Sequence, residues 1–160
     1  MQEVSLPILS IVGWSGAGKT TLLARLLRAL TRAGLRVGTA KHHHRATADD
    51  RGKDSDLHAR AGSALTALAG PGQLALFLPA RHPTLADVAS LAARAADLDL
   101  LIAEGFTQEA RIAIRVADAR GRRRPVPRRC ELLADVDPRA RDPHHTPAAL
   151  ARLVLAWLRR

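Results

Sequence analysis

Aromatic residues are scarce in this sequence, and tyrosine is absent. Phenylalanine and tryptophan together make up 2 % of the chain. Proteins that hold single-stranded nucleic acid stack the bases on aromatic side chains, and no recognised nucleic-acid-binding module occurs here. We therefore expect no nucleic-acid partner, although the formal charge of +10 favours anionic ligands such as nucleotides.

Cysteine and long apolar runs are also lacking. Cys130 is the only cysteine, which excludes an intrachain disulfide and a cysteine cluster for zinc. No apolar run approaches the roughly 20 residues of a membrane-spanning helix. Residues 1–12 lack the basic segment and the cleavage site of a secretory signal. We expect a soluble, cytoplasmic protein without a membrane partner.

Lysine is rare beside arginine, because only Lys19, Lys41 and Lys53 occur among 25 basic residues. Most of the arginines are interpreted as solvated surface, whereas each lysine falls inside a motif described below. The length of 160 residues allows a single buried core. We therefore predict one domain over residues 1–160, with no second catalytic domain.

The most informative feature that is present is a phosphate-binding loop. Residues 13–20 read G-W-S-G-A-G-K-T and directly follow the apolar run Leu6 to Val12. In this pattern the loop amides surround a polyphosphate, Lys19 reaches the β- and γ-phosphates, and the Thr20 hydroxyl binds Mg²⁺. A glycine turn that binds only a stray anion would leave Lys19 unexplained. The sequence predicts a nucleoside triphosphate site.

The hydrophobic periodicity around this loop predicts an α/β protein. Leucines after the loop recur at helical spacing and stop before Gly34. A strand, a helix and a second strand in succession imply a parallel crossover. We expect a P-loop NTPase domain with a mostly parallel or mixed sheet flanked by helices. The other expected strands cover residues 35–40, 64–68, 74–78, 98–103, 111–117 (half-exposed) and 131–136, and the other helices cover residues 54–61, 85–96 and the C-terminus from Thr146.

A second acidic motif follows the strand expected at 98–103. Glu104 and Gly105 end this apolar run, so the carboxylate lies at the edge of the sheet where the phosphate loop is expected. A carboxylate there can hold Mg²⁺ directly or through water. The alternative is a solvated glutamate before a turn.

Two further motifs lie between residues 41 and 55. Lys41 and the run His42 to His44 follow the second strand and favour contact with a phosphate or a partner over a metal site, since consecutive extended residues point to opposite faces. Gly52-Lys53-Asp54-Ser55 joins a glycine, a lysine and a helix start. This second motif is explained equally well by an anion site and by simple helix capping.

Together these motifs resemble the MobB family of molybdopterin-guanine dinucleotide biosynthesis adaptor proteins. The order G-W-S-G-A-G-K-T-T-L, G-L-R-V-G-T-A-K-H, G-K-D-S and D-L-L-I-A-E-G-F carries the resemblance, which extends from Ile8 to about Val116. By this resemblance the nucleotide contacts are Gly13, Ser15, Gly16, Ala17, Gly18, Lys19, Thr20, Thr21, Lys41, His42, Lys53, Asp54, Ser55, Gly105 and Arg115. Lys19 and Glu104 are the implied catalytic residues, and Thr20 and Glu104 are the implied metal ligands.

The resemblance implies a homodimer that binds GTP with Mg²⁺ and hydrolyses it weakly. Its partner would be the guanylyltransferase that attaches GMP to molybdopterin, with molybdopterin-carrying proteins as further candidates. The chain departs from the family pattern in the histidines after His42 and in a slightly shorter loop before Gly52. Both Asp49 and Asp50 are therefore candidates for the family's acidic residue. The candidates for the two-fold contact are the strand at 111–117 and neighbouring exposed edges.

The residues themselves also allow two other functions, and they leave the base specificity unexplained. In a small-molecule or nucleoside kinase, Glu104 would bind the acceptor hydroxyl and residues 120–129 would supply an arginine-bearing lid. In a nucleic-acid-stimulated NTPase, the basic charge would bind the polymer, but the aromatic signals are missing. No guanine-reading N-K-x-D element occurs, so residues 131–137 are only a candidate for the base site.

Overall fold

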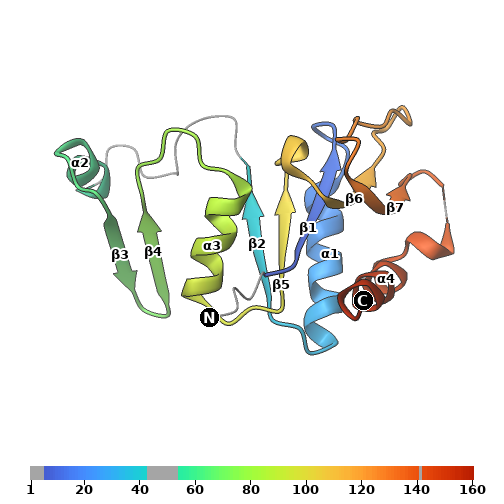
Figure 1. The fold of residues 1–160 in the computed structure, drawn as a ribbon, viewed down its shortest axis with the longest axis horizontal. Helices are drawn as coiled ribbons and strands as arrows, with labels where there is room; N and C mark the ends of the chain where they lie inside the picture. Colours follow the sequence, from blue (N-terminus) through green and yellow to red (C-terminus); the bar gives the residue numbers. More distant parts are fainter. Residues whose placement is uncertain (1–5, 43–53, 141) are drawn as a thin grey trace. The chain divides into compact units, whose positions relative to one another are not determined.

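The computed structural model describes residues 6–42, 54–140 and 142–160, which form two compact units (Figure 1). The first unit contains the described residues up to His42 and from Thr84 onward, and the second lies between them. The elements of the first unit are β1 (Ile8–Gly13), α1 (Lys19–Arg32), β2 (Val37–Lys41), α3 (Leu85–Ala95), β5 (Leu100–Glu104), η1 (Thr107–Glu109), β6 (Ile112–Val116), β7 (Glu131–Val136), η2 (Pro143–His145) and α4 (Pro147–Leu158). Those of the second are α2 (Asp54–Arg60), β3 (Thr66–Gly70) and β4 (Gln73–Phe77).

The five strands of the first unit form one sheet in the order β2-β5-β1-β6-β7. All four neighbouring pairs are parallel. The prediction of an α/β fold with a parallel sheet is therefore confirmed. Parallel pairing brings the carboxyl ends of the strands to one edge, where Lys41 is in register with Glu104 and Gly13 with Val116.

Helices cover this sheet on both faces. On one face α1 and α4 pack against each other over the main core, in which leucines from β1 and both helices are fully buried. On the other face α3 covers β5 and β2 through Leu85 and Ala89. Val126, from the segment between β6 and β7, packs beside β1 and β6 on that second face. The resulting layers leave the carboxyl edge of the sheet to the loops.

The strand β6 differs from its expected character. The alternation of residues 111–117 predicts a half-exposed strand that pairs across a two-fold axis, but β6 is hydrogen-bonded to β1 on one side and to β7 on the other. Ala113, Ile114 and Val116 are buried. The prediction of a two-fold contact through this strand is therefore wrong. The charge of Arg115 suggested an exposed face, but this charge is compensated within the sheet by Asp135 of β7.

The second unit is a short helix followed by a hairpin. Strands β3 and β4 are antiparallel, and Gly70 pairs with Gln73 across the two-residue turn Pro71-Gly72. Proline followed by a glycine with φ of 73° is the pattern of a type II turn. The expected helix and both strands are confirmed within two residues. None of the helices in the described parts of the chain is long and apolar enough to cross a membrane.

Candidate functional site

The loop between β1 and α1 is shaped by its glycines. Gly16 and Gly18 have φ of 76° and 85°, a conformation that other residues rarely adopt. A Cβ at Gly13 would lie 2.6 Å from the Val116 carbonyl oxygen, so the close approach of β6 requires glycine there. Gly18 is the N-cap of α1, and no described side chain caps this helix. Its first amides therefore remain available for an anion.

Lys19 lies within the loop, where its Nζ donates to the Trp14 carbonyl oxygen at 2.8 Å. Burial lowers the pKa of Lys19 below its usual value. The charge of Glu104 opposes this effect, whereas Arg124 and Lys41 lower the pKa further. The ammonium group therefore lies among other cations, an arrangement that a bound polyphosphate would stabilise.

Glu104 connects β5 to the loop. It is 7 % exposed, and the Thr20 hydroxyl donates to its carboxylate, whose two oxygens each lie 2.9 Å from Thr20 Oγ1. Lys41 Nζ lies 3.7 Å from Glu104 Oε1. The alternative of a solvated glutamate before a turn is therefore wrong. Parallel pairing of β2, β5 and β1 is what brings these three residues together.

The Thr20 and Glu104 oxygens fit a magnesium site. Mg²⁺ takes oxygen ligands at about 2.0–2.1 Å in an octahedron, which places neighbouring ligand atoms roughly 2.9 Å apart. The observed separation of 2.9 Å matches this spacing. The pair is a hydroxyl and a carboxylate, the hard donors that Mg²⁺ prefers. No group of three or more histidine, cysteine or acidic side chains that could hold a metal occurs among the described residues.

His42 and Gly105 form the neighbouring wall. The His42 amide donates to the Glu104 carbonyl oxygen at 2.9 Å, and the His42 ring meets Phe106 edge-to-face at a centroid distance of 5.0 Å. Gly105 has φ of 90°, and a Cβ on it would lie 2.8 Å from His42 Cβ. The predicted lysine–histidine pair and the Glu-Gly motif therefore meet at one place, with His42 packed beside the end of β5.

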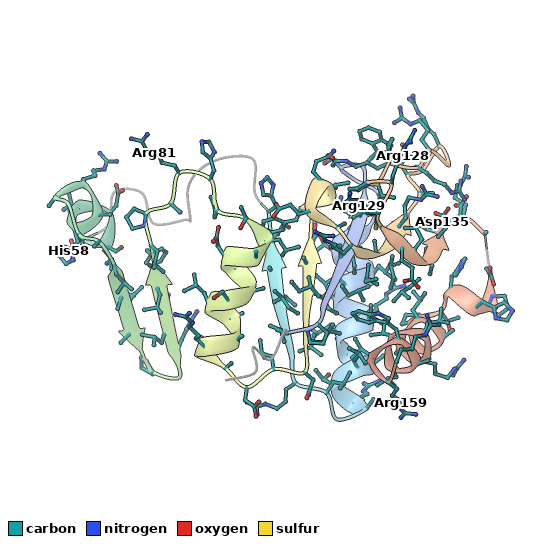
Figure 2. All side chains as sticks on the ribbon, viewed as in Figure 1. His58, Arg81, Arg128, Arg129, Asp135 and Arg159 are labelled. Carbon is teal, nitrogen blue, oxygen red and sulfur yellow. The ribbon has the colours of Figure 1, made fainter. Side chains whose placement is uncertain are left out.

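Arg124 is a residue that the sequence pattern does not single out. Its guanidinium lies 5.5 Å from the ring centroid of Trp14 in the loop, within cation–π range. It also acts electrostatically on Lys19. Arg124 belongs to the basic segment between β6 and β7, which includes Arg128 and Arg129 (Figure 2). The two residues before it, Arg122 and Arg123, are also arginines, so the local sequence gave no signal that separates Arg124 from them.

Arg115 is engaged inside the sheet. Its Nη2 donates to Asp135 Oδ2 at 2.6 Å, and Arg123 Nε donates to the same carboxylate oxygen at 3.0 Å (Asp135 is labelled in Figure 2). Hydrogen bonding to Asp135 raises the pKa of Arg115 above its usual value, while burial acts in the opposite direction. These contacts join β6 to β7. A contact of Arg115 with the nucleotide stays a prediction.

The expected G-K-D-S element is only partly described. Lys53 lies outside the described residues, as do His43, His44, Asp49 and Asp50. Asp54 and Ser55 begin α2 in the second unit, where the acidic first turn suits the helix dipole. The capping interpretation and the nucleotide contacts expected of Lys53, Asp54 and Ser55 therefore both stay predictions.

Comparison with known proteins adds an independent observation. The family model of MobB, molybdopterin guanine dinucleotide synthesis protein B, matches residues 8–137. The molybdopterin-guanine dinucleotide biosynthesis adapter protein of Escherichia coli is 40 % identical over 110 residues, or 67 % of this chain and 63 % of that protein. The protein of the same name from Haemophilus influenzae is 38 % identical over 105 residues, or 65 % and 59 % of the two chains.

Solved structures agree with the fold. The crystal structure of a MobB protein homolog from Bacillus stearothermophilus matches with a TM-score of 0.59 and 25 % identity, over 95 % of this chain and 97 % of that chain. The sequence matches to the curated relatives, in contrast, span less than two thirds of the length of those proteins.

Proposed function

This chain belongs to the MobB family, and we propose that it is a GTP-binding adaptor in the guanylation of molybdopterin to the molybdenum guanine dinucleotide cofactor. The observation that carries the proposal is the phosphate loop with Thr20 hydrogen-bonded to the buried Glu104. The curated relatives are named as adapter proteins of molybdopterin-guanine dinucleotide biosynthesis, which is the basis for naming the pathway.

The phosphates would be held by the loop and Lys19. The uncapped first turn of α1 supplies amide donors, and Lys19 would exchange its bond to the Trp14 carbonyl oxygen for the β- and γ-phosphates. Arg124, beside Trp14, would add a second cation on the outer side of the loop. Because Lys41 and Arg124 both act electrostatically on Lys19 in the free protein, a triphosphate would relieve this repulsion.

Thr20 and Glu104 are the proposed Mg²⁺ ligands. When bound, this ion neutralises negative charge on the β- and γ-phosphate oxygens. The hydrogen bond from Thr20 to Glu104 keeps both oxygens at the separation described above. Lys41 Nζ lies 3.7 Å from Glu104 Oε1 and places a positive charge beside this carboxylate at the edge of the sheet.

We propose that GTP hydrolysis is slow. Attack on the γ-phosphate needs a residue that orients water, and Glu104, the carboxylate hydrogen-bonded to the loop, is occupied by Thr20 and Lys41. Slow hydrolysis suits a protein whose nucleotide state controls a partner. We infer that this partner is the molybdopterin guanylyltransferase, that molybdopterin-carrying proteins are further partners, and that the protein acts in the cytoplasm.

We also propose that residues 1–160 work as one nucleotide-binding domain that forms a homodimer. The hairpin of the second unit exposes several leucines, which is unusual for an isolated monomer. They are Leu65, Leu68, Leu74, Leu76 and Leu78, each at least 46 % exposed within this chain. A surface of this kind supports the dimer better than β6, whose edges are both paired.

The first test compares GTP and ATP binding with Mg²⁺ in the wild type and in Lys19→Ala. We expect a preference for GTP, a loss of roughly 10-fold or more in the variant, and very slow phosphate release. Preference for ATP, together with turnover that rises when a nucleoside is added, would favour the kinase instead.

The adaptor role needs a second test. We expect purified molybdopterin guanylyltransferase to form the dinucleotide cofactor faster when the wild-type protein and GTP are added, and not when Lys19→Ala replaces it. An equal effect of both proteins would argue against a nucleotide-controlled adaptor.

A further inference from the structure

A cavity of about 420 Å³ opens beside the phosphate loop. Ala17, Gly18 and Thr21 of the loop and the start of α1 line it, and so do residues that follow β7, among them Asp137, Asp142 and His145. This volume lies within the range of small-molecule sites. Of the positions predicted from the sequence, those that line this cavity are in the loop and in the candidate base site at residues 131–137, where Val136 and Asp137 line it.

The position of the cavity indicates which part of a nucleotide it receives. Glu104 and Lys41 lie on the β5 side of β1, and they mark the end of the loop where the metal and the terminal phosphates are expected. The cavity lies on the other side, at the carboxyl ends of β6 and β7, where Val116 and Val136 line it. A polyphosphate that runs along the loop away from Glu104 therefore leads its nucleoside into this cavity.

The walls suit a flat heterocycle with a polar edge. Leu22, Val116, Val136 and Pro138 supply apolar surface. Polar groups come from Thr21 and Arg25 of α1 and from Asp137, Asp142, His145 and Thr146 after β7. Among these, His145 has an Nδ1 that is buried without a hydrogen-bond partner among the described residues. This Nδ1 lies 3.4 Å from Asp142 Oδ2.

Two carboxylates line the cavity, and their surroundings differ. Asp137 is occupied, because Arg139 donates its backbone amide and Nε to Oδ1 and Nη2 to Oδ2. The hydrogen bonds from Arg139 hold the pKa of Asp137 well below its usual range. Within the described part of the chain, Asp142 accepts one hydrogen bond, from the His144 amide to Oδ1 at 2.8 Å. Its carboxylate keeps acceptor capacity that Asp137 lacks.

We propose that this cavity binds the guanine base and that Asp142 accepts hydrogen bonds from its N1–H and 2-amino groups. Guanine presents these two donors side by side, which matches the two oxygens of a carboxylate. Adenine presents an unprotonated ring nitrogen at the same place, so a carboxylate would face a lone pair. The inference rests on the proposed GTP function and supplies the base preference that no N-K-x-D motif explains in this chain.

The test replaces one hydrogen-bond acceptor of Asp142 by a donor and keeps the hydrogen bond that its side chain accepts from the His144 amide. In Asp142→Asn the amide still accepts from the His144 amide, since asparagine and aspartate cap equally well. Xanthine carries a carbonyl where guanine carries the 2-amino group, and the asparagine amide can donate to it. We expect Asp142→Asn to bind GTP roughly 10-fold more weakly and to gain affinity for xanthosine triphosphate by a similar factor.

Asp137→Asn is the matched control, because Asp137 lines the same cavity but is paired with Arg139. It should leave the ratio of GTP to xanthosine triphosphate affinity unchanged. The gain of xanthosine triphosphate binding cannot arise from misfolding. A wild type that prefers GTP, with an unchanged ratio in Asp142→Asn or a switch in Asp137→Asn, would overturn this inference and leave the proposed function standing. A wild type without GTP preference would overturn both.

Discussion

At the scale of single residues, the charged side chains near the phosphate loop determine the electrostatics of the proposed nucleotide site. Lys19 interacts electrostatically with Lys41, Arg124 and the carboxylate of Glu104, and Lys41 lies close to the same carboxylate. Like charges held together in a folded protein raise its free energy, and an anionic ligand removes that repulsion. This local excess of positive charge supports the proposed nucleotide binding more directly than the overall charge of +10 does.

Replacement of Glu104 by glutamine tests the metal site. We expect Glu104→Gln to weaken Mg²⁺-dependent GTP binding about 10-fold or more, since the neutral amide is a weaker ligand. Binding measured without Mg²⁺ should change little. Asp99→Asn is the control, because Asp99 lies just before β5 at its opposite end and accepts from the Arg36 amide at 2.7 Å. An equal loss with and without Mg²⁺ would contradict the metal role.

Arg124 is expected to contact the terminal phosphates. Removal of one hydrogen bond to a charged group weakens binding by roughly 10-fold or more, so Arg124→Ala should lower GTP affinity by that factor and GDP affinity by less. Calorimetric titration of both nucleotides measures this difference. Arg128→Ala, an exposed arginine of the same segment, should have little effect. An equal loss of affinity for GTP and GDP would indicate that Arg124 acts only through its contact with the Trp14 ring and does not bind the terminal phosphate.

At the scale of elements, the close approach of β1 and β6 controls the loop. The Gly13 position leaves no room for a methyl group beside the Val116 carbonyl oxygen. Gly13→Ala should therefore destabilise the fold by about 1–3 kcal/mol, as measured by urea unfolding. Gly70→Ala, where no heavy atom lies within 4 Å of the added Cβ, is the control. Equal stability of the two variants would show that β6 can move away.

Elements differ in how well sequence predicts them. The leucines of α1 repeat at helical spacing, and β7 was expected at the residues where it occurs, 131–136. The strand β6 was misread because Arg115 alternates with apolar residues. An arginine in such a pattern usually indicates solvent, but here Asp135 on the neighbouring strand compensates it. Strand order along the sheet is a property of pairing, so no local pattern contains it.

At the scale of the whole molecule, the exposed leucines of the hairpin predict its association. Leu74 and Leu76 lie on one face of β4, and both are at least 50 % exposed. The double variant Leu74→Lys, Leu76→Lys should be monomeric by light scattering, because two charges cannot be buried in an apolar interface. GTP binding should persist, since the phosphate loop lies in the first unit.

The control for that variant is Leu153→Lys on α4, another exposed leucine. It should leave the oligomeric state unchanged. A wild type that is monomeric, or a double variant that remains dimeric, would contradict the proposed hairpin interface.

The sequence alone determined the parts of this protein that depend on local backbone and spacing. The loop amides, Lys19 and Thr20 form one continuous segment, so their geometry follows from their order. The meeting of Glu104 with this loop was also predictable, because parallel strands bring their carboxyl ends to one edge. Tertiary structure decided the sheet order, which places Glu104 on one side of the loop and the cavity with Asp142 on the other. It also decided the position of Arg124 over Trp14, because contacts between residues distant in sequence depend on how strands pair and loops close.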